Sequence, residues 1–158
     1  MVYTPPQHVD DIANLMDNLV DYINNDDLCD ADPLVKMAII HHQFESIHPF
    51  YDGNGRTGRI LNILYLVSQD LLTLPVLYLS RFIVHNKNDY YQHIQQVRDT
   101  GDWEAWLLYM LNGIIDTAKN TISLITQMKT QMADYKHRMR DQLSKIYSQD
   151  LLNNLFHH

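Results

Sequence analysis

The stretch that decides the fold reads His48-Pro49-Phe50-Tyr51-Asp52-Gly53-Asn54-Gly55-Arg56-Thr57-Gly58-Arg59. It holds three of the chain's five glycines, and the residues after it, 60–67, read ILNILYLV, which predicts a buried helix. A glycine-rich turn that opens a helix presents several free N–H groups and the positive end of the helix dipole. The segment therefore predicts an anion site, and its two arginines favour a polyphosphate as the anion.

Two common phosphate-binding motifs do not account for this segment. Residues 53–58 satisfy G-x-G-x-x-G, but a dinucleotide fold needs a strand before the motif and an acidic residue about 20 positions later. Here a helical pattern precedes the motif, and residues 76–79 contain no acid. A P-loop requires a lysine, which this segment lacks. Both readings are excluded.

A protein-only metal site at His41, His42, Glu45 and His48 is also disfavoured. The spacing H-E-x-x-H does not occur, and adjacent residues on a helix point about 100° apart. We expect one of the two adjacent histidines to pack inward with a hydrogen bond.

The side chains of the segment suit phosphate-group transfer. Arg56 and Arg59 lie three residues apart at a helix start, so two forked guanidiniums on one face could bracket a di- or triphosphate. Asp52 could hold Mg²⁺ against phosphate oxygens. Asn54 and the glycine amides could stabilise charge on an attacked phosphorus, and His48 supplies a base. We expect Phe50 to anchor the loop in the core.

Helical periodicity dominates the rest of the chain. Helices are predicted for residues 9–23, 34–47, 89–99 and 102–113, and a further helix begins in the glycine turn and runs to about residue 67. A polar turn is predicted at 24–33 and an irregular connection at 71–84. Apolar residues keep a near-heptad spacing over 114–146, which predicts a long helix, and residues 151–156 begin another amphipathic element. We predict two parts, a core at 1–113 and, at 114–158, this long helix with the start of a truncated region.

Composition narrows the class of protein. A chain of 158 residues with 46% hydrophobic and 20% charged residues is typical of a globular domain. The net charge of −7 disfavours duplex DNA or an anionic membrane as the main partner. The single Cys29 allows no intramolecular disulfide. No apolar run is long enough to span a bilayer and the start resembles no secretory signal, so we expect a cytoplasmic protein.

Residues 48–59 resemble the signature of Fic proteins (the Fic/Doc or Fido superfamily), H-P-F-x-[DE]-G-N-G-R-x-x-R, at every specified position. Further segments resemble the subfamily in which a Fic core precedes a winged helix: 3–6, 33–34, 41–47, 75–80, 90–91 and 101–103. The resemblance implies an all-α Fic core that transfers AMP from ATP to a Ser, Thr or Tyr hydroxyl of a target protein. It also implies the cofactors ATP and Mg²⁺.

The resemblance also assigns roles by position. His48 would be the base, with Asn54 and Arg56 completing the catalytic set, and Asp52 would ligate Mg²⁺. The nucleotide phosphates would be held by Gly53, Asn54, Gly55, Arg56, Gly58 and Arg59. Asn86, Tyr90 and Tyr91 lie where adenine and ribose bind in related proteins, although packing explains them equally well.

The match also has departures. An inhibitory helix with [ST]-x-x-x-E-[GN] is expected before the core, and the nearest match, residues 100–105, has a wrong final residue. Residues 2–6 resemble only the second strand of the target-aligning β-hairpin flap, so we expect a fragment. Alternatives remain open: transfer of another phosphate-containing group, AMP removal, or a non-enzymatic nucleotide-binding module. We expect no membrane or direct nucleic-acid partner, and a homodimer is possible.

Overall fold

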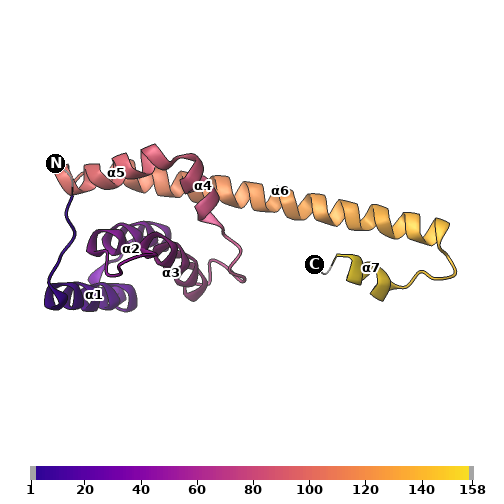
Figure 1. The fold of residues 1–158 in the computed structure, drawn as a ribbon, viewed down its shortest axis with the longest axis horizontal. Helices are drawn as coiled ribbons and strands as arrows, with labels where there is room; N and C mark the ends of the chain where they lie inside the picture. Colours follow the sequence, from indigo (N-terminus) through magenta and orange to yellow (C-terminus); the bar gives the residue numbers. More distant parts are fainter. Residues whose placement is uncertain (1–2, 157–158) are drawn as a thin grey trace. The chain divides into compact units, whose positions relative to one another are not determined.

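The structure, a computed structural model that describes residues 3–156, consists of helices joined by short connections (Figure 1). In chain order they are α1 (Val9–Asn24), the 3₁₀ helix η1 (Asp26–Leu28), α2 (Pro33–Ile47), α3 (Asn54–Ser68), α4 (Leu79–His85), α5 (Lys87–Thr100), α6 (Glu104–Gln142) and α7 (Gln149–Leu155). Residues 3–156 contain no strand, which confirms the all-α class.

The strand expected at residues 2–6 is not observed. Val2 lies outside the described residues, and 3–6 form an irregular segment. A strand needs a neighbour for its backbone hydrogen bonds, and the described chain offers none here. The chain divides into two compact units, residues 1–117 and 118–158. The division expected from the sequence, at residue 113, stays a prediction about domains.

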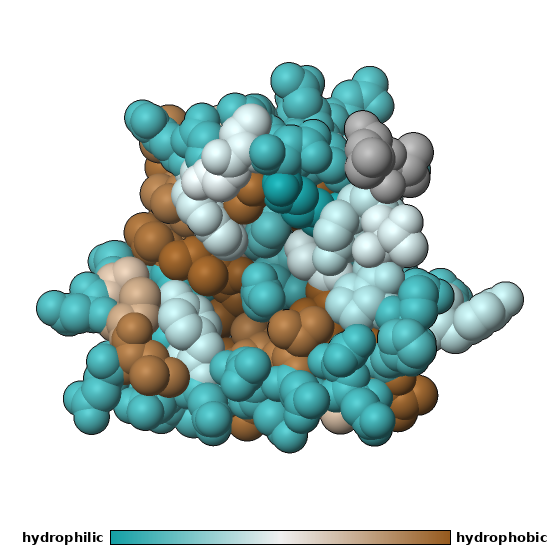
Figure 2. All heavy atoms as spheres, turned by 90° about the vertical axis from the view of Figure 1, so that its left-hand side faces the viewer, coloured by the Kyte–Doolittle hydropathy of each residue, from teal (hydrophilic) through white to brown (hydrophobic). Residues whose placement is uncertain are grey.

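Helix α2 is the centre of the first unit. Asp32 caps its N-terminus by accepting a hydrogen bond from the Leu34 amide at 2.8 Å, and Pro33 takes the first helical position. The helix packs against both α1 and α3. It is buried on nearly all sides, including Met37, Ala38, Ile40, Phe44 and Ile47. Viewed from one end of the molecule, hydrophobic side chains gather in a hollow that hydrophilic residues surround (Figure 2).

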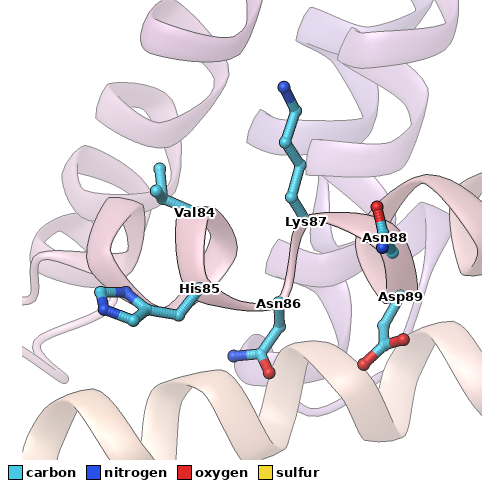
Figure 3. A pocket seen from close by; sticks show the side chains of 6 residues that line it. All are labelled: Val84, His85, Asn86, Lys87, Asn88 and Asp89. Carbon is cyan, nitrogen blue, oxygen red and sulfur yellow. The ribbon is translucent and has the colours of Figure 1, made fainter.

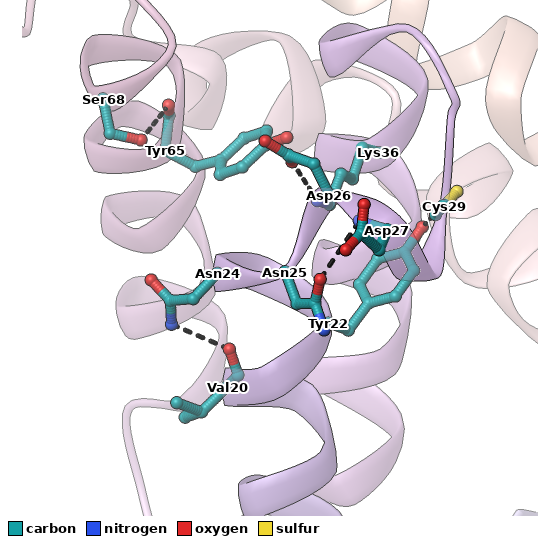
Figure 4. A network of polar contacts seen from close by, with 10 residues as sticks. All are labelled: Val20, Tyr22, Asn24, Asn25, Asp26, Asp27, Cys29, Lys36, Tyr65 and Ser68. Carbon is teal, nitrogen blue, oxygen red and sulfur yellow. Dashed lines mark hydrogen bonds and ion pairs between the residues drawn. The ribbon is translucent and has the colours of Figure 1, made fainter.

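A polar cluster at the η1 turn joins α1 to α2 (Figure 4). The Lys36 side chain is only 2% exposed, and its ammonium binds the Asp26 carboxylate at 2.9 Å. The same ammonium lies 5.3 Å from the centre of the Tyr22 ring, and the Tyr22 hydroxyl donates to Cys29 Sγ at 3.3 Å. The buried charge is therefore paired, as a buried charge must be to avoid a large desolvation penalty.

The N-terminal segment is fastened to the end of α2 by Arg98 of α5. The Tyr3 hydroxyl donates to the Ser46 carbonyl at 2.8 Å, and the Arg98 guanidinium stacks 3.9 Å from the Tyr3 ring centre. Arg98 also donates to Ser46 Oγ at 3.0 Å and to the Glu45 carbonyl at 3.2 Å. These contacts hold the last turn of α2, which leads into the predicted site.

Two predictions about the later helices are wrong in detail. Residues 79–85, expected within an irregular connection, form α4 after the turn that contains Pro75. The two helices expected at 102–113 and 114–146 are one helix, α6, which ends at Gln142. Gly113 does not end a helix: a Cβ there would lie 2.7 Å from the Phe82 ring, so glycine permits close packing of α4 on α6.

In the second unit, α7 follows the turn after α6. Met139 and Leu152 are buried, and the rings of Tyr135 and Phe156 meet edge to face with centroids 5.6 Å apart. Ile122, Leu124, Ile125 and Met128 of α6 are exposed. Among residues 3–156, no helix is both long and apolar enough to cross a membrane.

Candidate active site

His48 stands at the point where α2 ends. Its amide donates to the Phe44 carbonyl at 3.0 Å, and its backbone adopts the left-handed conformation with φ 52°. A left-handed non-glycine residue costs about 1 kcal/mol or more, and histidine is among the residues that tolerate it better. Pro49 then prevents the helix from continuing. The side chain of His48 is exposed, so the predicted base is accessible.

Asn54 closes the loop that follows. Its side-chain oxygen accepts from the Phe50 amide at 2.9 Å, and its side-chain nitrogen donates to the Phe50 carbonyl at 2.6 Å. The residue is only 2% exposed. Both polar atoms of the Asn54 side chain are thus hydrogen-bonded to the loop backbone. The expected role of Asn54 in stabilising phosphate charge stays a prediction. Phe50 was expected in the core, but it is 49% exposed and contacts Phe44 with one side of its ring.

The N-terminus of α3 lies where the glycine turn predicts an anion site. Gly53 is the N-cap with φ 85°, a conformation that glycine adopts without strain. The first intrahelical bond runs from the Thr57 amide to the Gly53 carbonyl at 2.9 Å. The amides of residues 54–56 precede it and have no acceptor within the helix, so they are available to an anion.

Asp52 and Arg56 pair with each other across this turn. The carboxylate accepts from the Gly53 amide at 2.7 Å and lies 3.1 Å from Arg56 Nη2. Both side chains are largely exposed, and exposed ion pairs contribute only about 0–1 kcal/mol. Phosphate oxygens and a cation could replace this pair at low cost.

Arg59 occupies a different environment from Arg56. Its side chain is half-buried, and its Nε is buried without a hydrogen-bond partner among the described residues. Its Nη1 would lie 3.1 Å from a Cβ on Gly55, whereas Arg56 Nη2 would lie 3.6 Å from one on Gly53. The two guanidiniums therefore flank the glycine turn: that of Arg56 is exposed to solvent, and that of Arg59 is half-buried.

Gly58, expected among the nucleotide-binding residues, faces α2. A Cβ there would meet Glu45 Oε1 at 3.1 Å and ring atoms of His41 and Phe44 at 3.2 Å. The glycine is buried, so the structure shows a packing role for it, and its expected nucleotide contact stays a prediction.

The three residues expected near adenine and ribose have different positions. Tyr90 is 5% exposed and its hydroxyl binds His41 Nε2 at 3.0 Å, so its ring belongs to the core. Tyr91 is 57% exposed and meets the Tyr90 ring edge to face. Asn86 donates to the Phe82 carbonyl at 2.9 Å and lines an open pocket of about 360 Å³ formed by residues 84–89 (Figure 3). Only Asn86 and Tyr91 are therefore accessible to a ligand.

Both adjacent histidines of α2 are buried, where one was expected. Asn62 Nδ2 lies 3.0 Å from His41 Nδ1, and His42 Nε2 lies 3.1 Å from the Ile94 carbonyl. Burial lowers the pKa of each imidazole from the usual 6.5 to about 4, so both are neutral at pH 7. A neutral His41 that accepts at Nδ1 carries its proton on Nε2 and donates to Tyr90.

The sequence analysis gave Glu45 and Asn62 no part in the predicted site. Glu45 Oε1 lies beside both Gly55 and Gly58, and burial raises the pKa of this carboxyl, while His48, Arg59 and Arg98 oppose the rise. The available signal was a glutamate in the last turn of the helix, three residues before His48.

A metal ion would depend on Asp52. No group of three or more His, Cys, Asp or Glu side chains suited to a metal occurs within residues 3–156. Asp52 is an exposed carboxylate that already faces a cation, and Mg²⁺ is commonly held by one carboxylate together with substrate phosphates. The donor set fits Mg²⁺ bound jointly with a phosphate ligand.

Fold and site together define a helical domain in which a glycine turn exposes backbone amides at the start of a central helix, α3. Residues 1–66 match the Fic/DOC family. A probable protein adenylyltransferase of Aquifex aeolicus is 45% identical over 71 residues, which are 44% of this chain and 21% of that protein. The protein adenylyltransferase fic-1 of Caenorhabditis elegans is 30% identical over 112 residues, 68% of this chain and 20% of the relative.

A solved structure shares the fold. The crystal structure of a Fic family protein from Desulfovibrio desulfuricans superposes with a TM-score of 0.69 at 32% identity, over 78% of this chain and 37% of that one. Residues 1–66 therefore carry a Fic/DOC family domain, and the predicted helical Fic core is confirmed. It spans about a fifth of the length of the curated relatives it matches.

Proposed function

We propose that this chain is the catalytic core of a protein adenylyltransferase that transfers AMP from ATP to a hydroxyl group of a target protein. One observation carries the proposal: an exposed histidine, an exposed carboxylate and two arginines surround the free amides at the start of α3. Relatives in two organisms bear the name protein adenylyltransferase, which supports this chemistry.

In this proposal the loop holds the triphosphate. Amides of residues 54–56 bind the α-phosphate, and Arg56 and Arg59 bind the β- and γ-phosphates. Asp52 exchanges its contact with Arg56 for Mg²⁺, which when bound would neutralise phosphate charge.

His48 then accepts the proton of the target hydroxyl. The hydroxyl oxygen forms a bond to the α-phosphorus while the bond to the β-phosphate oxygen breaks, and pyrophosphate leaves. Asn54 acts by keeping the loop closed. The base is accessible because it terminates α2 in a left-handed turn, outside the packed core.

The nucleoside would lie next to the start of α5. Asn86 and Tyr91 are the two accessible residues that we assign to the nucleoside, and Tyr90 supports them from the core. A hydroxyl-bearing protein is the expected partner. A cytoplasmic location, a second copy as partner and the absence of nucleic-acid binding stay predictions from the sequence.

The test uses Mg²⁺ and ATP labelled at the α-phosphate, with the protein alone and with a cell lysate. We expect labelled protein, a mass increase that corresponds to AMP, and loss of label in His48→Ala with ATP binding retained. A mass increase that corresponds to phosphate, or labelling that survives His48→Ala, would contradict the proposal. Nucleotide binding without any label would favour a regulatory module.

A further inference from the structure

Glu45 is a half-buried residue whose carboxylate the proposed reaction does not use. It lies on α2, one helical turn before His48, and its Oε1 has no hydrogen-bond partner among the described residues. A carboxylate oxygen that is buried and unpaired is costly, because it has lost water without gaining a donor. Such an atom calls for a partner nearby.

The guanidinium of Arg59 offers the matching donor. Its Nε is also buried and unpaired, and the described residues contain no ion pair between Arg59 and Glu45, so both groups are free to accept a partner. Both groups border the space left by one missing side chain: a Cβ on Gly55 would lie 3.1 Å from Arg59 Nη1 and 3.6 Å from Glu45 Oε1. Gly58 leaves further room, since its Cβ would lie 3.1 Å from the same carboxylate oxygen.

Other cations near Glu45 have partners or lie elsewhere. Arg98 faces the carboxylate from α5, but it is bonded to Ser46 Oγ and the Glu45 carbonyl and stacks on the Tyr3 ring. His48 is exposed at the end of α2. Arg59 combines proximity with an unpaired buried N–H.

A neutral hydrogen-bonded network centred on His41 lies near the carboxylate, since Glu45 Oε1 and His41 Cε1 both border Gly58. Asn62 and Tyr90 both bind His41, and the negative charge of Glu45 adds to burial in raising the pKa of the Tyr90 phenol. The phenol stays protonated and lies close enough to the carboxylate to feel its charge. The carboxylate is therefore confined between this network and the start of α3.

We propose that Glu45 is a positioning residue that pairs with the guanidinium of Arg59 across the space beside Gly55 and so orients the remaining Arg59 donors toward the terminal phosphates of a nucleoside triphosphate. The role toward ATP rests on the proposed function, whereas the pairing of Glu45 with Arg59 does not. A planar guanidinium held along one edge presents the remaining donors in a fixed fork, which suits bidentate binding of phosphate. Loss of Glu45 should therefore weaken the binding of a nucleoside triphosphate, and it should leave the binding of a nucleoside monophosphate unchanged.

The first experiment measures the pairing without any nucleotide. We expect the Arg59 Nε–H, assigned by its loss in Arg59→Lys, to exchange slowly with water in nitrogen-15 NMR spectra. Glu45→Gln should accelerate this exchange at least tenfold. Glu104→Gln is the matched control, because Glu104 is the chain's other glutamate and is exposed. Equal exchange in the wild type and Glu45→Gln would overturn the pairing.

The second experiment measures nucleotide affinity by calorimetry. Glu45→Gln should weaken ATP binding about tenfold, the effect of one charge-assisted hydrogen bond, and leave AMP binding unchanged. In an Arg59→Ala background the same substitution should have no further effect. Equal losses for ATP and AMP, or additive losses in the double variant, would show a merely structural residue. A wild type that binds no ATP would refute the proposed function, and the exchange measurement would still decide the pairing.

Discussion

Replacing Gly58 by alanine should destabilise the helical core, although alanine is the better helix former. The new methyl group would lie 3.1 Å from Glu45 Oε1, 3.2 Å from His41 Cε1 and 3.2 Å from Phe44 Cδ1. All three distances are shorter than ordinary van der Waals contact, and both ring residues are buried, so neither can move aside freely. To make room for the new methyl group, α3 would have to move away from α2.

The magnitude follows from two opposing effects. Alanine gains about 1 kcal/mol over glycine inside a helix. Overpacking a well-packed core costs about 1–3 kcal/mol, and three simultaneous close contacts place this site near the upper end. We expect a net loss of about 2 kcal/mol in the free energy of unfolding, which lowers Tm by about 4–8 °C in a chain of this size.

The assay is urea denaturation followed by the fluorescence of Trp106, which is completely buried in the same unit. Gly55→Ala is the matched control on the same helix. Its nearest neighbour is the end of the flexible Arg59 side chain at 3.1 Å, which can move, so its stability should change by less than about 1 kcal/mol. A Gly58→Ala variant as stable as the wild type would refute the packing argument.

Arg98→Met should lower the free energy of unfolding by about 2–3 kcal/mol in urea denaturation, because two hydrogen bonds to the end of α2 and a ring contact are lost. Tyr3→Phe removes one hydroxyl bond and should cost about 1 kcal/mol in the same assay. His42→Gln should flatten the dependence of stability on pH, since His41 and His42 have pKa values near 4 when folded and about 6.5 when unfolded. The unfolded chain binds more protons in this interval, so stability should fall from pH 6.5 toward pH 4. Asp52→Asn should change stability by less than about 1 kcal/mol but abolish Mg²⁺-dependent AMP transfer, as measured by radiolabelling.

Each of these experiments needs a control measurement, and the pH experiment also needs Glu45 to be taken into account. Glu45 titrates with the opposite sign, because its raised pKa gives a contribution that is present at low pH and lost as pH rises through the folded value. The pH experiment therefore compares His42→Gln with the wild type at each pH, and parallel curves would contradict it. For Asp52→Asn, AMP transfer at the wild-type rate would contradict the proposed role of the Asp52 carboxylate in metal binding. For Arg98→Met, a loss no larger than that of Tyr3→Phe would show that the arginine contributes little.

The twelve-residue segment could be interpreted from the sequence because its chemistry is local. His48, which ends one helix, and Gly53, which starts the next, are five positions apart in the sequence. Backbone geometry alone therefore brings them together. Helix periods likewise predicted α1, α2, α3 and α5 to within a few residues. The fusion of two predicted helices into α6 was missed because Gly113 can mark either a helix end or a close helix contact, and only Phe82 distinguishes them.

The sequence by itself determined that this chain is helical and that a glycine turn with two nearby arginines opens α3, because these properties depend on the order of neighbouring residues. The tertiary structure decided which of the nearby groups are accessible. Tyr90 and Gly58 face the core, Asn86 and Tyr91 remain accessible, and Glu45 lies beside Arg59. Burial depends on which helices meet, and those contacts join residues that the sequence places far apart.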